Sequence, residues 1–329
     1  MVSIKDVAKE AGVAISTVSK VLNNYPNVSR KTRERVMEVV DKLGFVPNSV
    51  AAALSSKNSG RIALLLKLNV QTQAIDEIDM QYIAGAISKA QELQLDVITI
   101  FFSMIENMSL EEMTRYFTSQ SIRGIIIYGM SKGDKTLHEL IRSRVFKTVV
   151  IDVPMSGDDT SCVGIDHVQA QYDVARKTVL ENQGKKLLYI AGTRNGYVTD
   201  DRLEAIRKLA DDLDLKVLIR NGNYSELQAR KITLKYARNR DMIVCASDLM
   251  AIGAMKALID MDIFRPVCGF DGIVLMGYVG KQMNTVRQDF AAISARAVEE
   301  IQRLLGGEKG RKVVMPHTLV RIKYEEIIR

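Results

Sequence analysis

The apolar positions at the start of the chain have a helical spacing and predict two short helices joined by a turn. The first helix would bury one face, formed by Ile4, Val7, Ala8 and Ala11. Ser3 is its expected N-cap, and Gly12 ends it and allows a tight turn. The second helix would bury Val18, Val21 and Leu22 and expose Ile15, Ser16, Ser19 and Lys20. Two such helices form either a helix-turn-helix, whose second helix enters the major groove of DNA, or an ordinary helical hairpin.

A third helix and a short apolar segment follow. Ser29 is the expected N-cap of a helix over residues 30–43, and Gly44 is expected to end it. The alanines of NSVAAAL are small enough to pack closely against a second copy of the same segment. Leu54 ends this segment without a core of its own to fill, and such a residue can wedge between base steps in the minor groove of DNA.

From Arg61 onward, continuous apolar stretches alternate with amphipathic ones in two successive series. The expected strands of the first series are RIALLLKL, DVITIFF, GIIIYG and TVVID, and those of the second are CVGID, LLYIAG, KVLIR, MIVCA and PVCGFD. The expected helices cover residues 80–93, 110–119, 136–142, 169–180, 201–213, 227–236 and 249–259. This alternation predicts an α/β core of parallel sheets covered on both faces, in two subdomains. Because ligands of such sheets bind at the carboxyl ends of the strands, the facing subdomains predict one cleft.

Composition and charge narrow the range of partners. The chain has a formal net charge of +7, and residues 1–60 hold nine Lys or Arg against five Asp or Glu, a local charge of +4. A basic helical head favours a polyanionic partner, and if the head is a helix-turn-helix that partner is double-stranded DNA. The three cysteines are scattered without CxxC spacing, no signal peptide opens the chain, and no apolar run is long enough for a membrane span. We therefore expect a cytoplasmic protein without a metal or another cofactor.

Four ordered motifs decide between the two interpretations of the helical head: IKDVAKEAGVAISTVSKVLN, VSRKTRERV, LGFVPN and NSVAAALSSK. Through them, residues 3–57 resemble the DNA-binding head of the lactose-repressor/galactose-repressor family of bacterial transcription regulators. The resemblance implies a helix-turn-helix head over residues 1–47 and a hinge helix with its linker over residues 48–60. It also implies base contacts by Ile15, Ser16 and Lys20 and a minor-groove wedge at Leu54. Together with short polar side chains suited to phosphate oxygens, the expected DNA contacts are Ser3, Ile15, Ser16, Thr17, Ser19, Lys20, Asn23, Ser29, Thr32, Asn48, Ala51 and Leu54.

The rest of the chain is similar to the effector-binding core of that family, which resembles periplasmic sugar-binding proteins. The stretches NTVRQDF and MPHTLV resemble its late crossover and its final strands. Because the family core crosses between its subdomains three times, the resemblance implies an N-subdomain of residues 61–157 plus 287–313 and a C-subdomain of residues 158–286 plus 314–329. No heptad tail follows the last strand, so we expect a two-fold dimer that pairs two heads on a pseudo-palindromic operator.

Five residues near the expected strand ends are candidates for binding an effector: Asp152, Arg202, Tyr224, Ser247 and Asp271. Carboxylates and a guanidinium suit sugar hydroxyls or heterocycle edges, and a tyrosine ring can stack on a ligand ring. Each of them matches a family position. Asp248 is expected either to cap the following helix or to contact the ligand. Departures such as Ser247 in place of the common Asn leave the effector open, with a sugar or a related metabolite as the expected class.

Two other functions are consistent with the sequence. A protein co-regulator, rather than a small molecule, would control the same DNA-binding role. A serine hydrolase would use Ser131 of GMSKG, which fits G-x-S-x-G, with His138, His167 or His317 as the base. Because short motifs often match by chance and no HGGG-type oxyanion loop occurs in the sequence, we expect no catalysis. We therefore predict a sequence-specific transcription regulator, a repressor rather than an enzyme, whose operator affinity is controlled by a small molecule.

Overall fold

The computed structural model describes residues 2–22, 28–45, 61–67, 76–279 and 283–321. The chain divides into two compact units, a helical head of Met1–Ser59 and an α/β core of Gly60–Arg329. The predicted hinge segment lies outside the described residues, and so do the predicted DNA contacts Asn23, Asn48, Ala51 and Leu54.

The head consists of the three predicted helices, α1 (Ile4–Ala11), α2 (Ile15–Leu22) and α3 (Arg30–Leu43). Ser3 caps α1 through a capping box, in which its hydroxyl accepts from the Asp6 amide and the Asp6 carboxylate accepts from the Ser3 amide at 2.8 Å. Gly12 and Gly44 end α1 and α3 in the left-handed region, which a residue without Cβ adopts without strain. Local sequence signals therefore set both ends of α1 and the C-terminal end of α3.

One apolar core holds the three helices together. Its buried members are Val7, Ala8, Ala11, Val18, Val21, Val36, Val39 and Val40. The side chain of Arg33 on α3 donates to the carbonyl oxygen of Val21 at 3.3 Å, and Lys42 forms an ion pair with Glu10 of α1 at 2.8 Å. Because exposed ion pairs contribute little stability, burial of the valines and alanines dominates the packing.

The core contains two six-stranded sheets. In spatial order the first consists of β11 (Lys312–Met315), β5 (Thr160–Ile165), β4 (Lys147–Ile151), β3 (Ile122–Ile127), β1 (Arg61–Leu66) and β2 (Val97–Phe101). The second consists of β12 (Thr318–Arg321), β10 (Asn284–Arg287), β9 (Val267–Cys268), β8 (Met242–Cys245), β6 (Lys186–Ala191) and β7 (Lys216–Asn221). Of the described strands, β12 alone runs antiparallel to its neighbour. The predicted α/β architecture with parallel sheets is confirmed.

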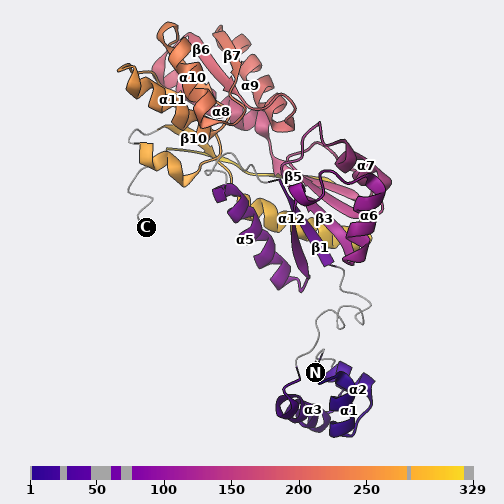
Figure 1. Cartoon of the computed structure of the whole chain (residues 1–329). Coiled ribbons are helices and arrows are strands. Elements are labelled where there is room, and N and C mark those ends of the chain that lie inside the picture. Colours follow the sequence, from indigo (N-terminus) through magenta and orange to yellow (C-terminus); the bar gives the residue numbers. More distant parts are fainter. Residues whose placement is uncertain (1, 23–27, 46–60, 68–75, 280–282, 322–329) are drawn as a thin grey trace. The chain divides into compact units, whose positions relative to one another are not determined.

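Helices cover both faces of the first sheet because successive side chains of its strands point in opposite directions. On β1, Ile62, Leu64 and Leu66 pack toward α5 (Asp76–Glu92) and α12 (Phe290–Leu305). Ala63 and Leu65 pack toward α6 (Leu110–Ser119) and α7 (Lys135–Ser143). Figure 1 shows α5 and α12 side by side on one face, with α6 and α7 on the other. The long helix α12 is not among the helices predicted above.

The second sheet is packed in the same way. Its helices are α8 (His167–Asn182), α9 (Tyr197–Leu213), α10 (Glu226–Tyr236) and α11 (Asp248–Asp260), and α8 packs against α9 as α10 packs against α11 (Figure 1). Short 3-10 turns occur at η2 (Phe102–Met104), η3 (Ala237–Asn239) and η4 (Val274–Val279). No described helix is both long and apolar enough to cross a membrane.

The chain passes between the two sheets at three places: from β5 to α8, from β10 to α12, and from β11 to β12. The first passage follows Ile165 rather than residue 157, because β5 pairs with β4 in the first sheet. The last lies between Met315 and Thr318 rather than after residue 313, because β11 pairs with β5 as far as Met315. A parallel pair is normally joined by a helix, and the loop from β4 to β5 contains none, which is why the sequence suggests an early boundary there.

Candidate effector cavity and DNA-binding face

A cavity of about 200 Å³ lies between the two sheets of the core. Its lining residues are Ile78, Tyr82, Asp152, Val198, Arg202, Tyr224, Ser247, Leu249, Asp271, Ile273, Gln288 and Phe290. All five residues predicted to bind an effector are among them. Four follow the strands β4, β7, β8 and β9, and the fifth, Arg202, lies on α9. The cavity therefore lies where the carboxyl ends of the strands meet, as expected for sheets of this type.

Three of these residues have an unusual backbone. Asp152, Tyr224 and Asp271 have φ values of 57°, 58° and 119°, in the region that favours glycine. Among the ten described non-glycine residues with positive φ, six lie at helix C-termini, where this conformation is common, and the other four follow strands. Strained backbone persists only where the surrounding structure holds it, and it concentrates at functional sites.

Arg202 is held rigidly at the floor of the cavity. It lies in the second turn of α9 rather than at its start, because α9 begins at Tyr197 and not at residue 201. The side chain is buried, donates to the carbonyl oxygen of Ala246, and lies with its guanidinium carbon 3.7 Å from the centre of the Phe270 ring. A guanidinium stacked on an aromatic face and bound to a carbonyl oxygen has a fixed position.

His167 connects Arg202 to Asp152. Nε and Nη2 of Arg202 lie 3.4 Å and 3.3 Å from His167 Nδ1. Because a guanidinium can only donate, Nδ1 must accept, so the ring proton is on Nε2. This Nε2 lies 2.9 Å from Asp152 Oδ1, and Arg202 Nη2 lies 3.6 Å from Asp271 Oδ1. Asp152, His167, Arg202 and Asp271 thus form a polar chain from the end of β4 in the first sheet to the end of β9 in the second.

Burial dominates the electrostatics of Asp271. It raises the pKa of this carboxyl to about 7, although Arg202 opposes the shift by favouring the charged form. Gln288 donates from Nε2 to Asp271 Oδ1 at 3.1 Å. The cavity is therefore lined by a carboxyl group whose charged form its neighbours compensate only in part.

The neighbouring residues Ser247 and Asp248 have different roles, and only Ser247 lines the cavity. Ser247 lines the cavity and is the N-cap of α11, since its Oγ accepts from the Met250 amide at 3.3 Å. Asp248 is fully buried and accepts from the amides of Gly272 and Ile273 at 2.7 Å and 3.0 Å. Burial raises the pKa of Asp248 to about 6, while these donors oppose the shift. Asp248 thus neither caps α11 nor lines the cavity; it holds the loop that carries Asp271.

Several lining residues are missing from the sequence prediction. Gln288 and Phe290 follow β10, so the strand-end rule that selects Asp152 would also have selected them. His167, which does not line the cavity but contacts Arg202 and Asp152, also follows a strand, β5. Tyr82 lies inside α5, and no local signal distinguishes it from a core residue.

The serine hydrolase alternative requires a histidine base beside the Ser131 hydroxyl, and none of the three candidate histidines lies there. The Ser131 hydroxyl donates to Asp134 at 2.8 Å, whereas His138 Nε2 lies 3.2 Å from the carbonyl oxygen of Ser131 rather than from its hydroxyl. His167 lies 2.9 Å from Asp152, and His317 lies 3.6 Å from Asp173. None of these described histidines contacts the hydroxyl that it would have to deprotonate.

The exposed face of α2 is the candidate DNA-binding face. Ile15, Ser16 and Lys20 are exposed, Thr17 and Ser19 are half-buried, and Val18 and Val21 attach the helix to the core of the head. An isoleucine 44% exposed at the first position of a helix has no packing role in the head. Among the other expected contacts, Ser3 and Ser29 act as helix caps, and the hydroxyls of Ser29 and Thr32 lie 2.8 Å apart.

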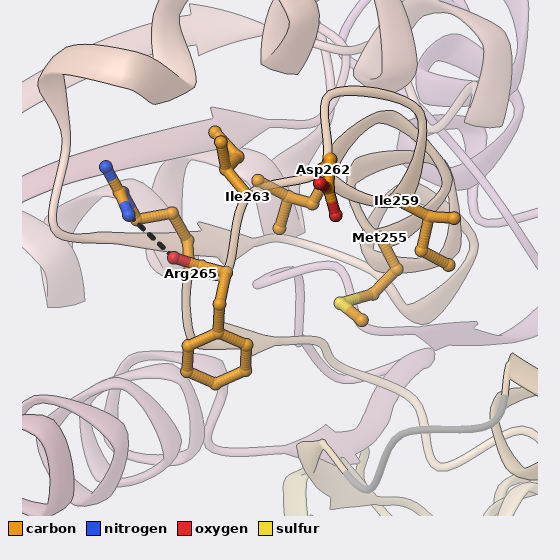
Figure 2. Close-up of a pocket in the computed structure, with 7 residues that line it drawn as sticks. Met255, Ile259, Asp262, Ile263 and Arg265 are labelled. Carbon is orange, nitrogen blue, oxygen red and sulfur yellow. Dashed lines mark hydrogen bonds between the residues drawn. The ribbon is translucent and has the colours of Figure 1, made fainter.

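A second cavity is less suited to a polar ligand. It has a volume of about 360 Å³ and lies at the C-terminal end of α11, lined by Met255, Leu258, Ile259, Asp262, Ile263, Phe264 and Arg265. In Figure 2, the guanidinium of Arg265 turns back to a backbone carbonyl oxygen, that of Phe264, at 2.6 Å. Asp262 and Arg265 are the charged residues that line this second cavity, whereas Asp152, Arg202 and Asp271 together line the cavity between the sheets.

Known proteins are similar to this chain in sequence and fold over nearly its whole length. Residues 3–48 match the profile of the bacterial regulatory proteins of the lacI family. The HTH-type transcriptional regulator MalR of Clostridium butyricum is 28% identical, over 96% of each chain. Catabolite control protein A of Staphylococcus epidermidis is also 28% identical, over 98% of each chain. The lac repressor dimer bound to operator and the anti-inducer ONPF has a TM-score of 0.82 at 22% identity, over 98% of this chain and 99% of that chain.

Residues 3–48 therefore form a DNA-binding head of the lacI family, and nearly the whole chain is similar to regulators with such a head. These matches indicate a DNA-binding transcription regulator with an effector-binding core, and the lacI family is not one of enzymes. The complex of the transcriptional regulator CelR with cellobiose has the same fold, with a TM-score of 0.70 at 21% identity over 98% of this chain and 99% of that chain.

Proposed function

We propose that this regulator is a cytoplasmic, dimeric repressor whose affinity for a pseudo-palindromic operator is controlled by a small molecule in the cavity of the core. The convergence of Asp152, Arg202, Tyr224, Ser247 and Asp271 on one cavity carries the proposal. These residues are far apart in the sequence, and packing of the core alone does not require them to meet. A sugar or a related metabolite is the proposed class of ligand.

Operator recognition is assigned to α2. Ile15 is suited to the methyl group of thymine, and Lys20 to O6 and N7 of guanine. Ser16 is placed beside them as a third base contact, and Thr17, Ser19 and Thr32 supply short hydroxyls for phosphate oxygens. The hinge segment, with Leu54 as a wedge, would add a minor-groove contact between the two half-sites.

Control of the operator follows from the position of the cavity between the two sheets. Asp152 follows a strand of the first sheet, whereas Asp271 follows a strand of the second. A ligand that contacts both favours one relative position of the subdomains and shifts the population of the state that binds DNA. The resemblance to a lac repressor solved with operator and anti-inducer supports this type of coupling.

The experiment that tests operator recognition compares two lysines of the head. An operator is first selected from random duplexes, and affinities for this operator and for random DNA are then measured by fluorescence anisotropy. Lys20→Ala should weaken operator binding by about tenfold or more, as expected for loss of a base contact. Lys42→Ala removes the same charge from a lysine paired with Glu10 and serves as the control. Equal losses on both DNAs for both variants would reject the assignment of α2.

Control by a small molecule is tested with the same selected operator. Extract of the source cells is separated into a low-molecular-mass fraction and a protein fraction, and each is added to the protein–operator complex. The proposal expects the low-molecular-mass fraction to change operator affinity. A response only to the protein fraction would instead support control by a protein co-regulator.

A further inference from the structure

Three residues that line the cavity offer acceptor oxygens: Asp152, Asp271 and Gln288. Oε1 of Gln288 is buried and has no hydrogen-bond partner among the described residues. Gln288 is buried and its Nε2 is held by Asp271, so its orientation is fixed and its Oε1 remains as an acceptor. A buried acceptor without a partner is unfavourable until a donor occupies the site.

The charged donor of the same cavity, Arg202, already has partners. The guanidinium of Arg202 is directed at His167, Ala246 and Asp271 and stacks on Phe270. The hydroxyls of Tyr224 and Thr199 lie 2.9 Å apart and share one hydrogen bond. Because the charged donor of the cavity already has partners, its carboxylates and the free amide oxygen of Gln288 favour a ligand that brings a charged donor.

The charge of the lining residues is negative. The cavity is lined by two carboxylates, those of Asp152 and Asp271, and by one charged donor, the guanidinium of Arg202. Burial raises the pKa of Tyr82 well above its ordinary value, and the charges of Asp152 and Asp271 raise it further. Two carboxylates against one guanidinium favour a cation in the cavity and oppose phosphate or carboxylate groups.

The size and walls of the cavity restrict the rest of the ligand. Its volume of about 200 Å³ lies below the roughly 300 Å³ at which pockets for drug-sized ligands begin, so it suits a single ring. The rings of Tyr82 and Phe290 lie edge-to-face with their centres 5.2 Å apart and form an aromatic wall. Such a wall can pack against a ring and can attract a cation.

We propose that the effector is a compact single-ring compound carrying a protonated amine, of the amino-sugar type, whose ammonium group is bound between Asp152, Asp271 and Gln288. This inference rests on the proposed function, in which the cavity binds the effector. The ammonium donates to all three acceptors and compensates the excess negative charge. The apolar remainder of the cavity and the aromatic wall contact the ring.

The test uses four compounds that share one ring: glucosamine, glucose, N-acetylglucosamine and glucosamine 6-phosphate. Binding to the full-length protein is measured by isothermal titration calorimetry at neutral pH. Glucosamine should bind about tenfold or more tightly than glucose or N-acetylglucosamine, because only its amine carries a charge. Glucosamine 6-phosphate should bind more weakly than glucosamine, because the phosphate meets the negative potential.

Two variants connect the preference to its residues. Asp271→Asn and Asp152→Asn should each reduce the ratio of glucosamine to glucose affinity toward about one, since the charge is lost while the shape is kept. Asp262→Asn changes an exposed aspartate outside this cavity and should leave the ratio unchanged. An unchanged ratio in Asp271→Asn and Asp152→Asn would reject the ammonium site even if glucosamine binds.

The remaining outcomes separate this inference from the proposed function. Tighter binding of glucose or of the phosphate ester overturns the amine assignment and leaves a small-molecule regulator. If no member binds while the low-molecular-mass extract still changes operator affinity, the amine assignment also fails and the regulator stands. If neither the series nor that extract has an effect, both proposals fail.

Discussion

At the scale of one residue, the buried carboxyl group of Asp271 lowers the stability of the folded protein as it becomes charged. Its folded-state pKa of about 7 exceeds the ordinary value of 3.8, mainly because the carboxyl is buried. Between these two values the folded chain retains a proton that the unfolded chain has lost, so the stability of the folded state falls as pH rises. The charged or polar groups facing Asp271 are Arg202 of α9, Asp248 of α11, Gln288 after β10 and Asp152 after β4.

We expect Asp271→Asn to stabilise the ligand-free protein above neutral pH by on the order of 2 to 3 kcal/mol, because the buried charge is removed. The same variant should also lose much of the decline in stability between about pH 4 and pH 7. Urea unfolding followed by circular dichroism across this pH range measures both effects. Asp262→Asn, an exposed aspartate that also has a positive φ, is the control and should behave like the wild type. Lower stability of Asp271→Asn at alkaline pH would contradict the assignment.

The sequence alone predicts some of the residues that line the cavity. A polar residue after a buried strand is visible in the sequence, and this signal finds Asp152, Tyr224, Ser247 and Asp271. The partners of these residues are not visible, because the contact between Arg202 and His167 joins positions that only folding brings together.

At the scale of elements, the packing of α5 against α12 shapes the cavity wall. A Cβ on Gly85 of α5 would lie 2.1 Å from the carbonyl oxygen of Ala291 in the first turn of α12. This close approach brings Tyr82 and Phe290 together at the cavity. The sequence predicts α5 but not α12, so the contact between the two helices was not predictable.

Gly85→Ala sets two effects against each other. Alanine improves the intrinsic helix propensity of α5 by about 1 kcal/mol, but overlap with a backbone oxygen forces the two helices apart at a cost of about 1 to 3 kcal/mol or more. We expect net destabilisation, because backbone atoms cannot move aside as a flexible side chain can. Thermal unfolding measures the effect. Gly157→Ala, whose Cβ would meet no atom within 4 Å, is the matched control and should have little effect. An unchanged or raised melting temperature for Gly85→Ala would show that the helices tolerate the separation.

At the scale of the whole core, contacts outside the cavity join the two subdomains. The amide of Lys132 donates to the carbonyl oxygen of Asn195 at 2.9 Å, and the Lys132 ammonium forms an ion pair with Asp200. Elsewhere, the Val274 amide donates to the Glu77 carboxylate at 3.1 Å. These contacts stabilise the described position of the subdomains, and therefore the shape of the cavity.

Lys132→Met should reduce effector affinity by about two- to fivefold, the range expected when one exposed ion pair that favours the binding-competent position is lost. No residue of the cavity lining is changed, so the effect must come from the positions of the subdomains. Calorimetric titration with the identified effector measures it. Lys135→Met removes an exposed lysine nearby for which no ion pair is described, and should bind the effector as the wild type does. Equal losses in both variants would indicate a general effect of charge instead.

The sequence by itself determined the features that depend on neighbouring residues. The helical spacing of Val18 and Val21, the caps Ser3 and Ser29, and the terminating Gly12 and Gly44 specify the head. The continuous apolar strands specify parallel sheets, because only strands covered on both faces are apolar throughout.

Tertiary structure alone decided the features that depend on distant residues. It assigned β5 to the first sheet, because hydrogen bonds to β4 and β11 hold this strand whatever follows it in the chain. It also linked Asp152, His167, Arg202 and Asp271 and buried Asp271 deeply enough to raise its pKa. The physical reason is that burial and electrostatic potential arise from groups assembled in space, and local sequence patterns do not contain their distances.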